Sequence, residues 1–235
     1  MRCGGHARVS RILRCATGLL VLTIALVGCA APTTGSAPPA LVSDNAVGGL
    51  LLDAAEVNDV MGTTSIQAHS VVTSMGDHRP LLPNLSCLGV WQPNEASIYD
   101  PSHWKSMRQQ MLRTPDTDHW ETLIVQSVVS YRTADGARDF LAESADRWNK
   151  CVHHTVSIQV NSRVLPGWRS GELTRTDDRL AMPFARDDGG QWRSCQHVLQ
   201  AAANIIMDVV VCTPPAQPMT KAADVANRIE ARMPR

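Results

Sequence analysis

Apolar residues recur with helical spacing in three stretches of this chain. Between 134 and 153 they fall three or four positions apart, with one step of one, at Ala137, Phe140, Leu141, Ala145, Trp148 and Cys151. This spacing predicts an amphipathic helix with one buried face. Shorter helices are predicted at 53–62, where Asp53 and Glu56 suit a capping box before Gly62, and at 219–233, where Thr220 is the expected N-cap.

Alternating or β-branched runs predict strands between these helices. The runs lie at 105–113, 121–132, 155–160, 167–176 and 178–187. Residues 75–90 contain two prolines and no period, which predicts a long loop, and Asp100-Pro101-Ser102 predicts a turn. Because strands follow one another instead of alternating with helices, the pattern predicts an α+β fold, a single domain with a central antiparallel sheet flanked by helices.

The stretch 195–212 predicts a hairpin at the end of this sheet. Residues 205–211 are largely β-branched, and asparagine tolerates the left-handed conformation, so a two-residue turn is expected at Ala203-Asn204. In that register Cys195 lies directly opposite Cys212. A non-hydrogen-bonded pair brings two Cβ atoms close enough for a disulfide.

The N-terminal segment has the pattern of an exported protein. Positive charge without acidic residues, at Arg2, Arg8, Arg11 and Arg14, precedes the apolar run Leu19–Val27. A helix that crosses the ~30 Å hydrocarbon core needs about twenty residues, so this run is too short. Residues 1–28 are therefore predicted to be a signal peptide that is removed.

The last four residues of that segment, Leu26-Val27-Gly28-Cys29, resemble a bacterial lipobox. They predict that Cys29 receives a diacylglyceryl group and becomes the first residue of a lipoprotein, attached to the outer face of the cytoplasmic membrane. The alternative is an ordinary signal peptide in which this Leu-Val-Gly-Cys sequence occurs by chance.

The composition of the chain after Cys29 distinguishes a flexible stalk from a folded domain. Residues 29–43 are rich in Pro, Ala, Thr and Ser and predict a flexible stalk, so the folded domain is expected at 44–235. The chain has 22 basic and 22 acidic residues, and loss of the four signal-peptide arginines leaves 18 basic residues and a net charge of −4. A mildly acidic domain without basic clusters argues against nucleic acid as a partner.

The number of cysteines predicts a second disulfide. Of the seven cysteines, two leave with the signal peptide and Cys29 is expected to be acylated, which leaves four. An even number in an exported protein predicts two disulfides. If Cys195 pairs with Cys212, then Cys87 remains to pair with Cys151. The spacings match neither a zinc site nor a thioredoxin motif.

Five stretches, taken in order, resemble one family. They are LLDAAEVNDVMG, the CLG after a loop, SIYDPSHW, VVSYRTADGARDFLAESADRWNKC and CQHVLQAAANIIMDVVVC. In this order they resemble the PknH-like extracellular domain, which occurs on a mycobacterial receptor kinase and also alone on a set of lipoproteins. The similarity runs from about Leu41 to Pro234.

The resemblance implies a compact α+β domain with an antiparallel sheet, two disulfides and a large cleft for an unidentified ligand. This chain departs from the kinase because it has a lipobox where the kinase has a transmembrane helix, and it has no catalytic kinase motif. We therefore expect a sensor-like domain that phosphorylates nothing.

Enzymatic motifs are few. Ser102-His103-Trp104-Lys105 matches the S-x-x-K of penicillin-binding enzymes, but Ser43-Asp44-Asn45 precedes it instead of following it, and no K-T-G occurs. His153-His154 point in directions some 100° apart on a helix, and Asp187-Asp188-Gly189-Gly190 lacks the ligand spacing of a calcium loop. We expect no catalytic residue, no metal and no cofactor.

Tryptophan is the unusual component, with six against two tyrosines and two phenylalanines. Trp148 fits the buried face of its predicted helix. Aromatic residues near loops and strand ends can line a ligand cleft, and we predict this for one or two of Trp91, Tyr99, Trp104, Trp120 and Trp168.

The sequence thus favours a non-enzymatic, lipid-anchored envelope protein whose cleft binds a small molecule or a cell-wall fragment. A protein-interaction module, accessory to receptor-kinase signalling or in competition with it, is the alternative, and a hydrolase of another type ranks third. Polar groups converging beneath aromatics favour the first reading, whereas a contiguous apolar surface patch favours the second.

Overall fold

The computed structural model describes residues 40–81, 85, 87–160, 162–187, 192–215 and 219–234, apart from the side chains of residues 160, 187 and 192. Residues 38–235 form one compact unit. The predicted signal peptide, Cys29 and most of the predicted stalk lie outside the described residues, as do residues 188–190 of the Asp187-Asp188-Gly189-Gly190 stretch.

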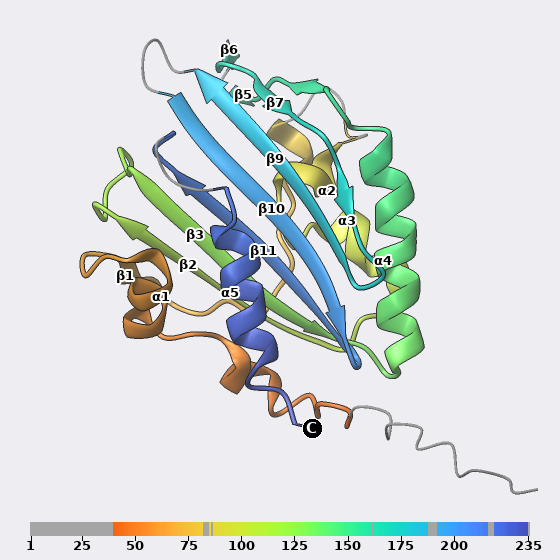
Figure 1. Ribbon diagram of the computed structural model, residues 1–235. Helices are drawn as coiled ribbons and strands as arrows, with labels where there is room; N and C mark the ends of the chain where they lie inside the picture. The colour runs from red at the N-terminus through yellow and green to blue at the C-terminus, as the bar shows by residue number, and fades with distance from the viewer. Residues whose placement is uncertain are drawn as a thin grey trace, which may run out of the picture. The chain divides into compact units, whose positions relative to one another are not determined.

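The chain folds into short helices and a series of strands (Figure 1). In order these are η1 (Val47–Leu50), α1 (Ala54–Met61), β1 (Gln67–Ala68), η2 (Arg79–Leu81), α2 (Leu88–Trp91), α3 (Ala96–Tyr99), η3 (Asp100–Ser102), β2 (Ser106–Thr114), β3 (Thr122–Ser130), α4 (Ala134–Asn149), β4 (Thr155–Val156), β5 (Gln159–Val160), β6 (Arg163–Val164), β7 (Trp168–Ser170), β8 (Thr174–Arg175), β9 (Arg179–Asp187), β10 (Trp192–Ala202), β11 (Ile205–Thr213) and α5 (Lys221–Glu230).

A nine-stranded antiparallel sheet organises the domain. Its strands run in the order β1-β2-β3-β11-β10-β9-β7-β4, and β8 also pairs with β9. Strands β5 and β6 form a separate hairpin. The α+β prediction with a central antiparallel sheet is therefore confirmed. Strand β11 lies near the middle of this order, and all its residues are buried, so both of its faces are covered.

The hairpin β10–β11 has the predicted register. Cys195 lies opposite Cys212, and the two form a disulfide. Its two-residue turn is at Ala203-Asn204, but Ala203 takes the left-handed conformation, with φ 46°, and not the expected Asn204. The Asn204 side chain instead makes three hydrogen bonds to the main chain, and these link the turn to two other segments.

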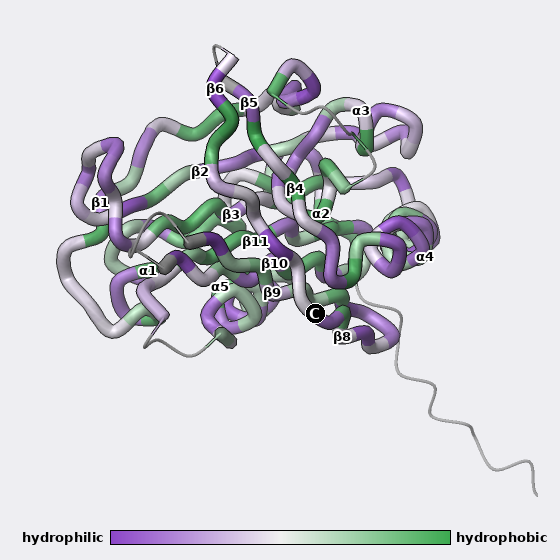
Figure 2. Tube along the Cα trace, turned by 90° about the horizontal axis from the view of Figure 1, so that it is seen from above, coloured by the Kyte–Doolittle hydropathy of each residue, from purple (hydrophilic) through white to green (hydrophobic). Residues whose placement is uncertain are grey.

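Helices cover both faces of the sheet. Figure 2 shows α1 and α5 on one side of the central strands and α2 and α3 on the other, where α4 also packs. We call these the α5 face and the α4 face. Side chains of β11 alternate between them: Met207 and Val209 join the core of the α5 face, whereas Ile206 and Val210 join that of the α4 face.

On the α5 face the sequence signals are followed closely. Asp53 and Glu56 form the predicted capping box, and Gly62 ends α1 in the left-handed conformation with φ 70°. Thr220 precedes α5 but makes no capping hydrogen bond through its side chain, contrary to the prediction. The apolar stripe of α5 is nevertheless buried, at Ala222, Val225, Ala226 and Ile229.

On the α4 face the sequence signals are weaker. The predicted loop over 75–90 contains η2 and the start of α2, and neither α2 nor α3 was expected from the sequence. The helix predicted to 153 ends at Asn149. The predicted disulfide between Cys87 and Cys151, with Cα atoms 5.7 Å apart, ties the start of α2 to the residues that follow α4.

A buried carboxylate connects these short helices to the sheet. Asp208 on β11 accepts hydrogen bonds from the Tyr99 hydroxyl (2.7 Å) and the Asn94 N–H (3.1 Å), and its other oxygen lies 2.5 Å from Nε2 of His197. Nδ1 of His197 donates to the carbonyl of Val90. The network therefore fixes α2 and α3 against the middle of the sheet.

The folded domain begins ahead of the boundary expected at residue 44. Val42 is buried in the α5-face core, and its N–H and carbonyl both bond the Asn204 side chain, at 2.8 and 3.0 Å. We call this contact the Val42–Asn204 clamp. Across the described ranges, no helix has the length and apolar character needed to cross a bilayer.

Candidate functional site

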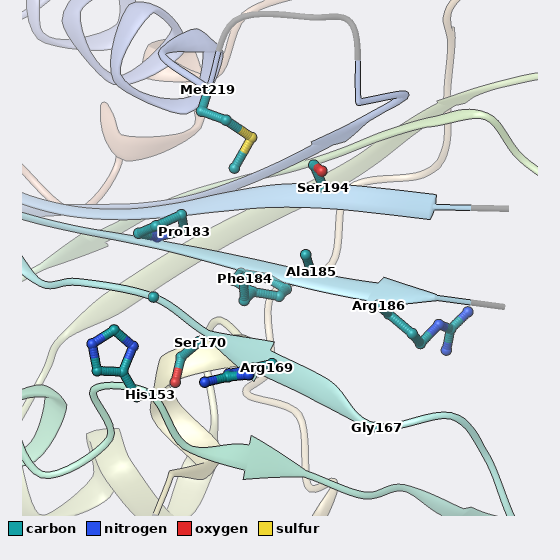
Figure 3. Close-up of a pocket in the computed structure, with 11 residues that line it drawn as sticks. His153, Gly167, Arg169, Ser170, Pro183, Phe184, Ala185, Arg186, Ser194 and Met219 are labelled. Carbon is teal, nitrogen blue, oxygen red and sulfur yellow. The ribbon is translucent and has the colours of Figure 1, made fainter. Parts of the chain in front are cut away.

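Described residues line two cavities of ligand size on this domain. The larger, about 650 Å³, lies at the N-terminal end of α4, and we call it the α4 cavity. The second, about 530 Å³, lies over β7, β9 and β10, and we call it the β9 groove (Figure 3). Both volumes fall within the roughly 300–1,000 Å³ that small-molecule sites occupy.

Three segments form the α4 cavity: residues 101–105, residues 131–133 and the side of α4 that includes Gly136, Asp139, Phe140 and Glu143. The first segment turns sharply because His103 ends η3 in the left-handed conformation, with φ 59°. It is joined to the sheet by the N–H of Lys105, which donates to the carbonyl of Ser130 (2.8 Å). Adjacent strand and helix ends therefore hold the cavity walls in place.

The base of the α4 cavity is aromatic and hydrogen-bonded. The Tyr131 and Phe140 rings have centroids 5.8 Å apart, and Phe140 also packs against Tyr99 at 4.3 Å. The Tyr131 hydroxyl lies 2.9 Å from Oγ of Ser102. Burial is the main cause that raises the pKa of Tyr131 above its ordinary value of 10.0, so this hydroxyl keeps its proton at physiological pH.

Charged groups of both signs line the α4 cavity. Lys105 and Arg132 come from the two loop segments, as does the imidazole of His103, whereas Asp139 and Glu143 lie along α4. Glu143 lies 3.5 Å from Arg147 of the same helix. Within the described part of the chain, the other four side chains make no ion pair or hydrogen bond, although opposite charges line one cavity. The two walls are thus held apart across open space.

The serine in this cavity is not arranged as a nucleophile. Ser102 Oγ donates its proton to the carbonyl of Tyr99 (2.6 Å), which leaves it to accept from the Tyr131 hydroxyl. Lys105, the other residue of the S-x-x-K match, is exposed, and no hydrogen bond joins it to Ser102 among the described contacts. A serine whose proton is committed to a carbonyl has no base to activate it.

The five aromatic residues predicted to line a cleft are scattered. Trp104 alone among them contributes to either large cavity; its ring is half-buried and its Nε1 lies 3.3 Å from Asp100 Oδ1. Trp91, Tyr99 and Trp168 are core residues, exposed by 6, 2 and 8%. The half-buried ring of Trp120 is covered by the Arg193 guanidinium, 4.0 Å from its centroid. One of the five candidates, Trp104, thus lines a large cavity, and its contact with a ligand stays a prediction.

Sequence reasoning missed most of the groups that do line the α4 cavity. Arg132 ends a predicted strand and Thr133 follows it, whereas Asp139 and Glu143 lie on the polar side of a predicted helix, so these residues resemble ordinary solvated polar positions. The start of the helix was the sequence signal that could have located this cavity. Thr133 caps α4 by accepting the Gly136 N–H (3.1 Å), and functional groups often lie on the loop that joins a strand to a helix.

Metal binding has no support from the described residues. No group of three His, Cys, Asp or Glu side chains there is placed to hold an ion. His153 instead contacts Glu172 through Nε2 at 2.7 Å, and His197 belongs to the buried network of Asp208.

Comparison with known proteins gives a consistent result. The profile of the family described as PknH-like extracellular domain matches residues 42–232. The chain is 30% identical over 176 residues to the serine/threonine-protein kinase PknH of Mycobacterium bovis, and the match covers 74% of this chain and 29% of the kinase. The serine/threonine-protein kinase PknH of Mycobacterium tuberculosis H37Rv gives 30% identity, covering 74% of this chain and 28% of the kinase.

A solved structure extends this likeness to the fold. The crystal structure of the extracellular domain of PknH from Mycobacterium tuberculosis matches with a TM-score of 0.75 and 26% identity, covering 82% of this chain and 97% of the solved one. The chain spans less than a third of the length of the curated kinases it matches. The resemblance predicted from sequence is confirmed.

Proposed function

Because this chain belongs to the family of PknH-like extracellular domains, we propose that it is a lipid-anchored envelope protein whose α4 cavity binds a small polar molecule or cell-wall fragment. The domain acts by binding and not by catalysis. The observation that carries this proposal is the pair of oppositely charged walls, held apart around a cavity of about 650 Å³ beside Trp104.

The walls favour a ligand that carries charges of both signs. Lys105 and Arg132 suit a carboxylate, because charge-assisted hydrogen bonds from ammonium and guanidinium groups are stronger than neutral ones. Asp139 suits an ammonium group on the opposite side, and the ring of Trp104 offers an apolar surface for a sugar or a methyl group. A muropeptide with a free amine and a free carboxylate combines these features.

Calorimetry with matched ligands tests this proposal. The probes are a muropeptide with a free amine and the same muropeptide with that amine acetylated, added to the folded domain with both disulfides formed. We expect the free amine to bind at least about tenfold more tightly, because acetylation removes the charge that faces Asp139. Equal affinity for both probes would contradict the arrangement.

Variants on one helix provide the control. Asp139→Asn lines the cavity and should reduce the affinity for the free amine, whereas Asp146→Asn is an exposed change on α4 outside the lining and should leave it unchanged. If neither muropeptide raises the melting temperature at high excess, the ligand-binding proposal is wrong and the alternative, a protein-interaction module, is favoured. A hundredfold excess over Kd should stabilise the folded state by about 2.7 kcal/mol.

The lipid anchor has a separate test. The residues Leu26-Val27-Gly28-Cys29 support acylation at Cys29 and placement at the outer face of the cytoplasmic membrane. Metabolic labelling with palmitate should mark the intact chain and should be lost in Cys29→Ser. Labelling that persists in Cys29→Ser would refute the anchor while leaving the binding proposal intact.

A further inference from the structure

The floor of the β9 groove is a part of the α5 face that none of the described helices covers. Arg169 on β7, Ala185 on β9 and Ser194 on β10 are aligned across three paired strands, and aligned residues project from the same side of a sheet. Helix α5 begins only at Lys221 and packs on β10 and β11. Among the described elements, the row therefore extends past the end of the helix layer.

Apolar groups make up most of this surface (Figure 3). Pro183 and Ala185 lie on β9, and Met219, just before α5, points toward the strands from the opposite side. The segment at Gly171 lies close to Pro183 of β9. A Cβ at Gly171 would lie 2.9 Å from Cγ of Pro183, and the Gly171 N–H donates to the carbonyl of that proline (2.8 Å). The groove is thus a narrow apolar channel.

Positive charge lies along one side of this channel. Arg169 shares the row with Ala185, whereas the Arg186 guanidinium stacks at 4.7 Å over Trp168, a core residue of the α4 face. The Arg169 guanidinium forms no ion pair with any carboxylate in the part of the chain that the structure describes. Among the described lining residues there is no Asp or Glu.

We propose that the β9 groove is a second binding site, distinct from the α4 cavity, for an amphipathic anion: one apolar chain ending in a carboxylate or phosphate. The apolar floor receives the chain. The Arg169 guanidinium, at its edge, forms charge-assisted hydrogen bonds to the anionic end, the geometry for which arginine is best suited.

Calorimetry on the folded protein with both disulfides tests the site with three probes. Decanoate has the chain and the charge, decanol has the chain alone, and acetate has the charge alone. We expect decanoate to bind once per chain, at least about tenfold more tightly than decanol, and acetate to show no binding. Decanol binding as tightly as decanoate would overturn the role of the arginine.

Four variants locate the binding. Arg169→Gln should weaken decanoate at least tenfold and leave decanol unaffected, while Arg175→Gln, an exposed strand arginine outside the groove, should change neither. Ala185→Phe and Ser194→Leu each fill the floor and should abolish decanoate binding. Equal losses in the two arginine variants, or unchanged binding in both folded floor variants, would overturn the assignment.

The anion could be a free molecule or the headgroup of a membrane lipid, and vesicles distinguish these sources. We expect decanoate to bind in solution and phosphatidylglycerol vesicles to bind no more protein than phosphatidylcholine vesicles do. Binding to phosphatidylglycerol vesicles without binding to decanoate would overturn the free-ligand proposal. Asp139→Asn should leave decanoate binding unchanged, so this test fails or succeeds independently of the α4 cavity.

Discussion

The two faces of the sheet are held by different forces. The α5 face buries an apolar core under two helices that follow their sequence signals in amphipathic spacing, and α1 also follows its capping signal. The α4 face adds a disulfide and a network of buried ionisable groups to its apolar core. Within the described residues, the buried acidic and basic side chains Glu95, His197 and Asp208 all belong to the α4 side.

This difference follows from the length of the helices. A helix of four residues, such as α2 or α3, is too short to present an apolar stripe or to be stable by itself. Its position must be set by individual bonds, here the Cys87–Cys151 disulfide and the hydrogen bonds of Asp208. Helix α5 has ten residues, and four buried apolar side chains are enough to position it.

The largest expected effect is loss of the Cys87–Cys151 disulfide. Its cysteines are 64 positions apart, and closing a loop of that size stabilises the folded state by about 4 kcal/mol in the chain-entropy model. Denaturant unfolding of Cys87→Ser/Cys151→Ser should show that loss. Cys195→Ser/Cys212→Ser, with a separation of 17, should lose about 3 kcal/mol in the same model. A smaller loss from the first pair than from the second would break the comparison.

Asp208→Asn should have the next largest effect, with about 3 kcal/mol lost, because an amide cannot accept the same three hydrogen bonds in a buried site. The matched change Asp224→Asn is on the exposed side of α5, 4.0 Å from Lys221, and should alter stability by less than about 0.5 kcal/mol. Unfolding curves of the two variants measure the difference. Equal effects would mean that the network does not hold α2 and α3.

A smaller effect is expected at the start of α1. Asp53→Ala removes the side chain that accepts the Glu56 N–H at 2.9 Å, and loss of such a cap costs about 1 kcal/mol. Asp59→Ala, an exposed change in the same helix, should cost less than about 0.5 kcal/mol. If Asp53→Ala were as mild as Asp59→Ala in denaturant titrations, capping would not be what fixes this helix on the α5 face.

The smallest effect is a pH dependence at the edge of the α4 face. Nδ1 of His78 contacts Glu95, whose side chain is fully buried, and this hydrogen bond raises the pKa of His78 above its ordinary value of 6.5. A raised pKa in the folded state stabilises it fully below pH 6.5, and this contribution is lost as the pH rises through the raised pKa.

Urea titrations of the parent protein and His78→Gln, at about pH 5.5 and about pH 9, measure this contribution. The parent protein should be more stable than His78→Gln by a larger margin at the lower pH. Glu95→Gln should lower the pKa of His78, which an NMR titration of the imidazole can follow. A stability difference that grows with pH would contradict this prediction.

Periodic features were predictable from sequence, and features set by single contacts were not. The register of β10–β11 followed from one turn and one cysteine pair, because a hairpin of known loop length has one register. The short helices α2 and α3 could not be predicted, since Asp208 and Cys151, which hold them, are 60 or more positions away in sequence.

The same limit applies to the sites. Aromatic residues near loops were reasonable candidates for a cleft, but burial of Trp91, Tyr99 and Trp168 depends on how distant segments pack. Arg169 and Ser194 are aligned only because β7, β9 and β10 are neighbours in the sheet, and no local pattern carries that strand order.

The Val42–Asn204 clamp also determines how the domain responds to mechanical load. Tension on the chain ahead of Val42 enters at the turn between β10 and β11, each of which is paired on both sides. The force is therefore shared among the ladders of four strands. A domain pulled through an edge strand would instead be peeled apart one hydrogen bond at a time.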